Sequence, residues 1–236
     1  KVFLDKSPRI VAYQLKRLDN QRLLMVQRKT DDAKYIPVYD SILSRIGMSP
    51  QFRQEALKAL VTLQKSNPVT VLMNAIGKLD AEDREENRTA KQLAVMLLGL
   101  NQAPLKEHSN ILWEAIKVDD DLSPSIAAAA LLMSNQSETD LGNLTGGQSG
   151  QLAFLKAITL IPDAKQRSPF RQRVLGLLDK SGNQQIKNAA ITAIGSLTNN
   201  QAESFVLLGP LITDDSLRVS TVRSMLKIPI KERDSE

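Results

Sequence analysis

One pattern of residues recurs along this chain at intervals of 24 to 38 residues. Each clear copy has a polar residue, an apolar residue three positions later, a basic residue next, and then small residues ahead of an aliphatic pair. The clearest copies begin at Ser49, Asn87, Asn183 and Asp214, and looser ones lie at 126–133 and 151–158. A period of this size is typical of repeats that consist of two helices and a turn. One such repeat cannot bury its apolar face alone, so neighbouring repeats have to stack.

Signals for helix starts favour an all-α fold. Serine can accept hydrogen bonds from the free N–H groups of a first helical turn, and proline fits at the first helical position. Helices led by Asn or Asp are predicted at 86–99, 183–197 and 214–227, and strand-type alternation is nearly absent. We therefore expect about twelve to fourteen helices with short polar connections. Four Ser-Pro pairs each precede an apolar-periodic stretch: Ser7-Pro8, Ser49-Pro50, Ser123-Pro124 and Ser168-Pro169.

The stretch 183–197 is rich in small residues, although its periodicity is that of a buried helix. Alanine lies at the centre of its apolar face and larger residues lie at the edges, which allows a neighbouring helix to approach closely. Gly195 lies on another side, and glycine costs about 1 kcal/mol relative to alanine within a helix. Its presence therefore predicts close packing on a second side. The apolar face consists of Ile186, Ala189, Ala190, Ala193 and Leu197.

This pattern resembles the second helix of the HEAT repeat, in which an acidic or Asn cap precedes an aliphatic residue, a basic residue and paired small residues. The resemblance covers most of the chain and implies a single α-solenoid domain over 1–236, with about five to six helix pairs. Several copies lack the opening Asp, and Ala127 stands where the family has a basic residue. The resemblance also implies that the recurring basic residues form a structural ladder between repeats: Arg53, Lys91, Lys187 and Arg218.

Few residues of this chain could carry chemistry. The absence of cysteine excludes disulfides, thiolate metal sites and a cysteine nucleophile within it. His108 is the only histidine and lies among charged and polar neighbours. The glycine-rich stretch 145–150 lacks the preceding strand and the Gly-Lys ending of a phosphate-binding loop, so we interpret it as a loop between repeats. No apolar run is long enough to cross a bilayer. We expect no catalytic residue, no cofactor and no bound metal.

Positive charge is concentrated in a basic N-terminal capping region, residues 1–29. Eight basic and two acidic residues give this region a net charge of +6, against +5 for the whole chain. One face of the helix expected after Pro8 could engage phosphates and stack a base. The alternative is a solvated face on a capping helix, complemented by an acidic neighbouring domain. The residues of this candidate interaction surface are Arg9, Tyr13, Lys16 and Arg17.

A narrower resemblance concerns residues 1–57. They are similar to the HEAT-like segment of large exported bacterial proteins, where that segment adjoins sugar-dehydrogenase-like, cytochrome c or cupredoxin domains. We expect the chain to be a piece of such a longer protein. The resemblance implies an exported or periplasmic location and places redox chemistry in the neighbouring domains. The function we expect is then a non-catalytic scaffold that positions neighbouring domains or a protein partner.

Two alternatives remain open. Alkylpurine DNA glycosylases of one family are HEAT-like solenoids of similar length with a basic concave face, and this chain resembles them in fold and charge. Those enzymes use a cleft rich in Trp and Tyr, whereas Trp113 has no aromatic neighbour in the sequence. A HEAT-like bilin lyase or chaperone subunit is the second alternative. Basic residues along a concave wall, with Trp113 facing into it, would favour the glycosylase. Charge confined to the first helices would favour the scaffold and make nucleic acid binding unexpected.

Overall fold

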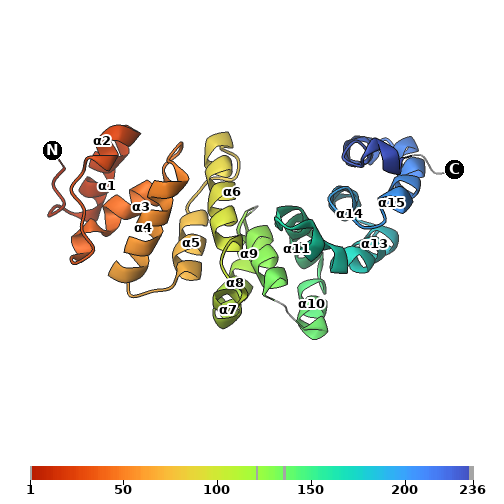
Figure 1. Cartoon of the computed structure of the whole chain (residues 1–236), viewed down its shortest axis with the longest axis horizontal. Helices are drawn as coiled ribbons and strands as arrows, with labels where there is room; N and C mark the ends of the chain where they lie inside the picture. Colours follow the sequence, from red (N-terminus) through yellow and green to blue (C-terminus); the bar gives the residue numbers. More distant parts are fainter. Residues whose placement is uncertain (1, 121, 135–136, 234–236) are drawn as a thin grey trace. The chain divides into compact units, whose positions relative to one another are not determined.

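The computed structural model describes residues 2–120, 122–134 and 137–233, and for residue 138 only the backbone (Figure 1). Within these ranges every regular element is a helix and no strand occurs, so the prediction of an all-α fold is confirmed. Lys1, one of the eight basic residues of the N-terminal region, lies outside the described residues.

The helices of this chain are short. Of those described, α6 is the longest, with 15 residues. The α-helices are α1 (Pro8–Lys16), α2 (Asn20–Leu24), α3 (Ile36–Ser44), α4 (Pro50–Leu63), α5 (Pro68–Ile76), α6 (Arg84–Leu98), α7 (Gln102–Glu107), α8 (Ser109–Ile116), α9 (Ser123–Met133), α10 (Glu138–Leu144), α11 (Gln148–Leu160), α12 (Ala164–Arg167), α13 (Arg171–Lys180), α14 (Gln184–Ile194), α15 (Gln201–Leu208) and α16 (Arg218–Met225). The 3-10 helices are η1 (Ala33–Tyr35), η2 (Ser168–Phe170), η3 (Gly209–Thr213) and η4 (Ile230–Glu232).

Most side-chain caps of the helices come from Asn and Asp, and one comes from Ser137, whose hydroxyl accepts from the Asp140 N–H at the start of α10. The Ser7 and Ser49 hydroxyls accept no hydrogen bond from the helices that follow, so this part of the Ser-Pro prediction is wrong. Pro8 and Pro50 nevertheless open those helices, because the fixed φ angle of proline suits the first helical position without a side-chain cap. Side chains that do accept from first-turn N–H groups include those of Asp19, Asn67, Asp83 and Asn183.

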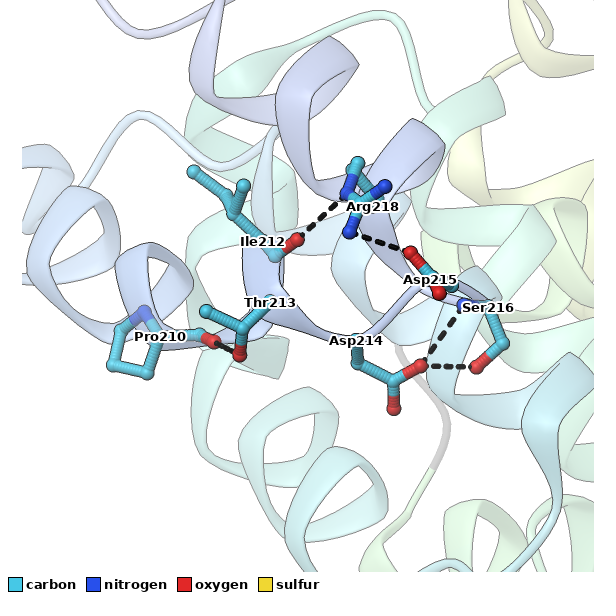
Figure 2. Close-up of polar contacts among 7 residues, drawn as sticks. All are labelled: Pro210, Ile212, Thr213, Asp214, Asp215, Ser216 and Arg218. Carbon is cyan, nitrogen blue, oxygen red and sulfur yellow. Dashed lines mark hydrogen bonds and ion pairs between the residues drawn. The ribbon is translucent and has the colours of Figure 1, made fainter.

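The helix predicted at 214–227 begins four residues later, at Arg218. Figure 2 shows the reason: the Asp214 carboxylate accepts from the backbone N–H of Ser216 at 2.9 Å and from the Ser216 hydroxyl. These bonds hold the pKa of Asp214 below its usual range. Side chains that bond to nearby backbone in this way compete with helix formation. The turn around Asp214 therefore delays the start of α16.

Packing divides the chain into two compact units. The first comprises Lys1–Ile111 with Asp120–Ser123, and the second comprises Leu112–Asp119 with Pro124–Glu236. In the first unit α3 packs on α4, α4 on α5 and α5 on α6 (Figure 1). In the second, α14 packs against α11, α13 and α16. Contacts between near neighbours are what stacked helix pairs require. The single solenoid domain over 1–236 stays a prediction.

The small residues of α14 allow close packing, as its sequence predicts. Ile186, Ala190 and Ala193 are buried, whereas Ala189 at the margin of the stripe is half-buried. Gly195, the C-cap of α14, is also buried. A Cβ atom built at this position would lie 2.6 Å from the Cβ and 2.8 Å from the Cα of Ser224 on α16. The prediction of close packing on a second side of this helix is confirmed.

Asp40 on α3 is a partly buried carboxylate. Burial raises the pKa of Asp40 above its ordinary 3.8, and Lys78, with Nζ 4.0 Å from Oδ2, offsets only part of this effect. The folded state then binds the proton of Asp40 more readily than the unfolded state does. The free energy of unfolding therefore falls as the pH rises from the unfolded pKa through the folded pKa and Asp40 ionises. We expect Asp40→Asn to raise the melting temperature more at pH 7 than at pH 3.5. Thermal unfolding of both proteins at each pH measures this, and an equal change at the two pH values would contradict it.

Candidate interaction surface

The four residues of the predicted interaction surface all lie exposed on or directly after α1. Arg9, Tyr13, Lys16 and Arg17 fall within an arc of about 100° around the helix axis. Tyr13 is 62% exposed. Val11 and Leu15, on the opposite side, are buried in the first unit. The apolar side of α1 therefore fixes which side presents the cations to solvent.

Tyr13 and Arg17 contact each other on this surface. An Arg17 guanidinium nitrogen donates a hydrogen bond to the Tyr13 hydroxyl at 3.1 Å. The centre of the same guanidinium lies 5.5 Å from the centroid of the Tyr13 ring, within the range of a cation–π interaction. The pair is four residues apart, which brings side chains together on a helix. The guanidinium thus orders the tyrosine and covers part of one ring face.

The cations on this surface are not neutralised. Arg9, Lys16 and Arg17 have no acidic partner within hydrogen-bond or ion-pair distance among the described residues. Two other cations of the basic region do have one: Arg22 lies 3.5 Å from Asp19 and Arg28 lies 3.0 Å from Glu55. The positive charge of the region is therefore most available to a partner along α1.

Arg45 holds the C-terminal end of α1 in place. Its guanidinium donates to the carbonyl oxygen of Leu15 at 2.7 Å and to that of Lys16 at 3.4 Å. The last carbonyl groups of a helix lack partners within it, and an arginine donor satisfies them while opposing the negative end of the helix dipole. The position of the exposed face of α1 is therefore fixed by the hydrogen bonds of Arg45.

An open hollow of about 690 Å³ adjoins the chain just after α1. Met25 in this hollow is 83% exposed, and Phe3 is 46% exposed. Exposed large apolar side chains grouped in this way are typical of binding surfaces. The hollow combines apolar side chains with two cations: Phe3, Leu4, Leu18, Met25, Val26, Arg22 and Lys34 are among its lining.

Of the predicted ladder, Arg53 alone is buried, at 1% exposure. Its guanidinium donates to the carbonyl oxygens of Leu43, of Arg45 at 2.7 Å and of Met48 at 3.3 Å, which end α3 and lie in the loop that follows. It also donates to Gln92 Oε1 on α6 at 3.1 Å. Arg53 therefore connects the α3–α4 pair to a later helix, as the ladder predicts.

The other three ladder residues do not share this role. Lys91 is exposed and Lys187 is half-buried, and neither makes a side-chain hydrogen bond or ion pair within the described chain. Arg218 donates to the Ile212 carbonyl oxygen at 3.0 Å and pairs with Asp215, both in the segment just before α16 (Figure 2). In these three repeats, the residue just before the basic one is buried, as Arg53 is in its own repeat. The structure thus does not bring the four together as one ladder.

Two arginines that the sequence pattern missed connect neighbouring helices in the second unit. Arg171 is buried and donates to Ser204 Oγ at 2.7 Å, and its second terminal nitrogen lies 3.2 Å from Glu203 Oε2 without the alignment of a hydrogen bond. Arg167 donates to the Ser196 carbonyl oxygen at 2.8 Å and to that of Ile161 at 2.7 Å. Both stand outside the recurring motif, so its spacing gave no signal for them.

The residues that the sequence offered as candidates for chemistry do not form a catalytic or metal site among the described residues. His108 is half-buried at the C-cap of α7. Gly150 lies in the first turns of α11, where an added Cβ would fall 1.8 Å from the Leu144 carbonyl oxygen, so the glycine is required by a close approach of the backbone. Groups of three or more potential metal-ligating side chains do not occur in the part of the chain that the structure describes.

Trp113 shows no aromatic cleft around it. It is half-buried on α8 and makes no contact with another aromatic ring within the described ranges. Among those residues, no helix is both long and apolar enough to cross a membrane.

Comparison with known proteins returned no match: no protein family, no curated protein and no solved structure is similar to this chain at a significant level.

Proposed function

We propose that this chain is a non-catalytic, HEAT-like helical scaffold that binds a protein partner through the exposed face of α1. The observation that carries the proposal is a contrast between two sets of arginines. Arg45, Arg53 and Arg167 donate to backbone carbonyl groups and hold helices together. Arg9 and Arg17 face solvent without an acidic partner in the described chain. Arginine beside exposed tyrosine is the composition enriched at protein-binding surfaces.

The α1 face favours an acidic protein over nucleic acid. The helix has nine residues, so it is about 14 Å long. Its three unpaired cations are fewer than the roughly six to ten phosphate contacts of a typical DNA-binding surface. The Arg17 guanidinium already lies over the Tyr13 ring, which leaves less of it for a stacked base. The apolar hollow beside α1 suits the side chains of a protein.

A photocrosslinking amino acid at Ala12, an exposed position on α1, tests this proposal. In the full-length protein, in cells that make it, we expect one discrete adduct with a protein. The double change Arg9→Glu and Lys16→Glu should reduce the adduct at least tenfold, because the surface would then repel an acidic partner. The same crosslinker at Gln51, exposed on α4, is the matched control and should not form that adduct.

Three outcomes would overturn the proposal. One is the same adduct from both crosslinker positions, and another is an adduct unaffected by the charge reversal. The third is an adduct that nuclease removes, together with a shift of duplex DNA in a gel that weakens steeply between two salt concentrations. That last result would favour the DNA-binding alternative.

A further inference from the structure

The outer face of α16, in the second unit, is apolar and uncovered. Val219 is 61% exposed and Leu226 is 65% exposed, and Val222 lies between them along the same face. Ile230, in η4 after the end of this helix, is 74% exposed as well. The opposite side of this helix is buried against α14. We call the exposed residues Val219, Val222 and Leu226 the outer stripe.

A groove of about 560 Å³ runs beside the outer stripe, with walls from α14 and α16. Most of its uncharged hydrogen-bonding side chains are already partnered within the chain. Asn188 donates to the Ser216 carbonyl oxygen at 3.2 Å and accepts from the Ser220 hydroxyl. The Thr192 hydroxyl donates to the Asn188 carbonyl oxygen at 2.8 Å. The groove therefore offers an incoming ligand mainly apolar contact and charge.

The available charge along the groove is positive. Arg223 and Lys227 line it, both are exposed, and neither has a side-chain partner among the described residues. At the start of α16, by contrast, Arg218 pairs with Asp215, and the Asp214 carboxylate accepts hydrogen bonds from Ser216 (Figure 2). The cations without acidic partners therefore lie beside the apolar residues that are exposed.

From these features we infer that the groove between α14 and α16 binds an amphipathic helix of a partner protein, apolar along one stripe and acidic beside it. Apolar side chains at helical spacing fit a hydrophobic groove as anchors, and carboxylates would face Arg223 and Lys227. A second copy of this chain fits less well. Its own stripe carries the same two cations, and its α1 face is also basic, so like charges would meet. This inference goes beyond the proposed function, which places binding on α1 in the first unit.

The test uses the whole chain and a fluorescent, helix-stapled peptide of about 15 residues with a leucine stripe flanked by glutamates. We expect the peptide to bind, and a matched peptide with lysine at each glutamate to bind at least tenfold more weakly. Leu226→Gln should weaken binding at least tenfold. Arg223→Glu combined with Lys227→Glu should reverse the preference between the peptides. Fluorescence anisotropy measures each affinity, and circular dichroism shows whether each variant is folded.

Val95→Gln is the matched control, because Val95 is 64% exposed on α6, in the first unit, and its replacement should not change binding. Equal binding of the two peptides would overturn the inference, as would binding that Leu226→Gln leaves unchanged. So would a concentration-dependent dimer in sedimentation that Leu226→Gln abolishes, since a second copy would then occupy the groove. Arg9→Glu with Lys16→Glu should leave peptide binding intact, so failure here is distinct from failure of the α1 proposal.

Discussion

Replacing Gly195 by alanine is expected to lower the free energy of unfolding by about 2 to 3 kcal/mol. The added methyl group would lie 2.6 Å from the Cβ and 2.8 Å from the Cα of Ser224. The nearest atoms therefore include backbone, so α14 and α16 have to move apart to admit it. Separation of these helices would also loosen the contacts of Ala193 and Ile194, which are fully buried. Urea unfolding followed by circular dichroism measures the change.

Gly176 provides the matched control for this substitution. It lies in the middle of α13, and a Cβ built there meets nothing within 4 Å. Because alanine is favoured over glycine within a helix, Gly176→Ala should raise the free energy of unfolding by about 0.5 to 1 kcal/mol. Adding Ser224→Gly to Gly195→Ala should recover part of the loss, since two of the three clashing atoms, Cβ and Oγ of Ser224, are removed. If Gly195→Ala were as harmless as Gly176→Ala, the close packing of α14 on α16 would be refuted.

The sequence predicted α14 well because local pattern and packing agree there. An Asn cap, an apolar stripe and small residues each point to a closely packed helix, although this helix ends at Ile194 and Gly195 is its C-cap, not an interior residue. The ends of α16 were predicted less well. Asp214 and Ser216 resemble a helix cap in sequence, but in the structure they form a turn before the helix. Asp214 and Ser216 can form either a helix cap or a turn. The outcome depends on the preceding η3, and the recurring motif contains no information about η3.

The basic residues show where the repeat pattern misleads. A motif aligns Arg53 with Lys91, Lys187 and Arg218 by spacing, yet burial follows helix rotation, and one residue changes the direction of a side chain by about 100°. Arg53 points inward. The other three basic residues come one position after the buried position of their own repeats, so they are rotated away from the core. The carbonyl groups that Arg45 and Arg53 satisfy belong to helix ends and to a loop defined only by the fold. These roles depend on helix lengths and crossing, which spacing alone does not specify.

The two candidate surfaces, the exposed face of α1 and the outer stripe, differ in how well the sequence predicts them. The exposed face of α1 follows from a helical wheel, because its cations lie opposite the apolar residues Val11 and Leu15. The outer stripe of α16 does not, because the buried side of this helix carries the polar residues Thr221 and Ser224, so the sequence pattern does not show which side is covered. Only the packing shows that α14 covers one side of α16 and leaves Val219 and Leu226 exposed. The partly covered helix is therefore a property of the tertiary structure.

Arg53→Met is expected to be among the most destabilising single substitutions in the first unit, by about 3 kcal/mol. Methionine fills much of the space but offers no donors. The carbonyl oxygens of Leu43, Arg45 and Met48 would lose their arginine donor, and Gln92 would lose its link to α4. Burial lowers the pKa of Arg53 from its ordinary value, but arginine remains charged at any pH at which the protein folds. The loss should therefore be nearly independent of pH between 5 and 8, a range that urea unfolding can cover.

Lys91→Met is the control that decides whether the four basic residues are equivalent or Arg53 alone connects helices. Lys91 is exposed and has no side-chain partner within the described chain, so its replacement should change stability by less than about 0.5 kcal/mol. Gln92→Ala should cost about 1 kcal/mol, because it removes one of the hydrogen bonds that Arg53 makes. Similar losses from Arg53→Met and Lys91→Met would restore the ladder as a set of equivalent residues. A loss confined to Arg53 and Gln92 would instead establish one buried arginine as the connection between α4 and α6.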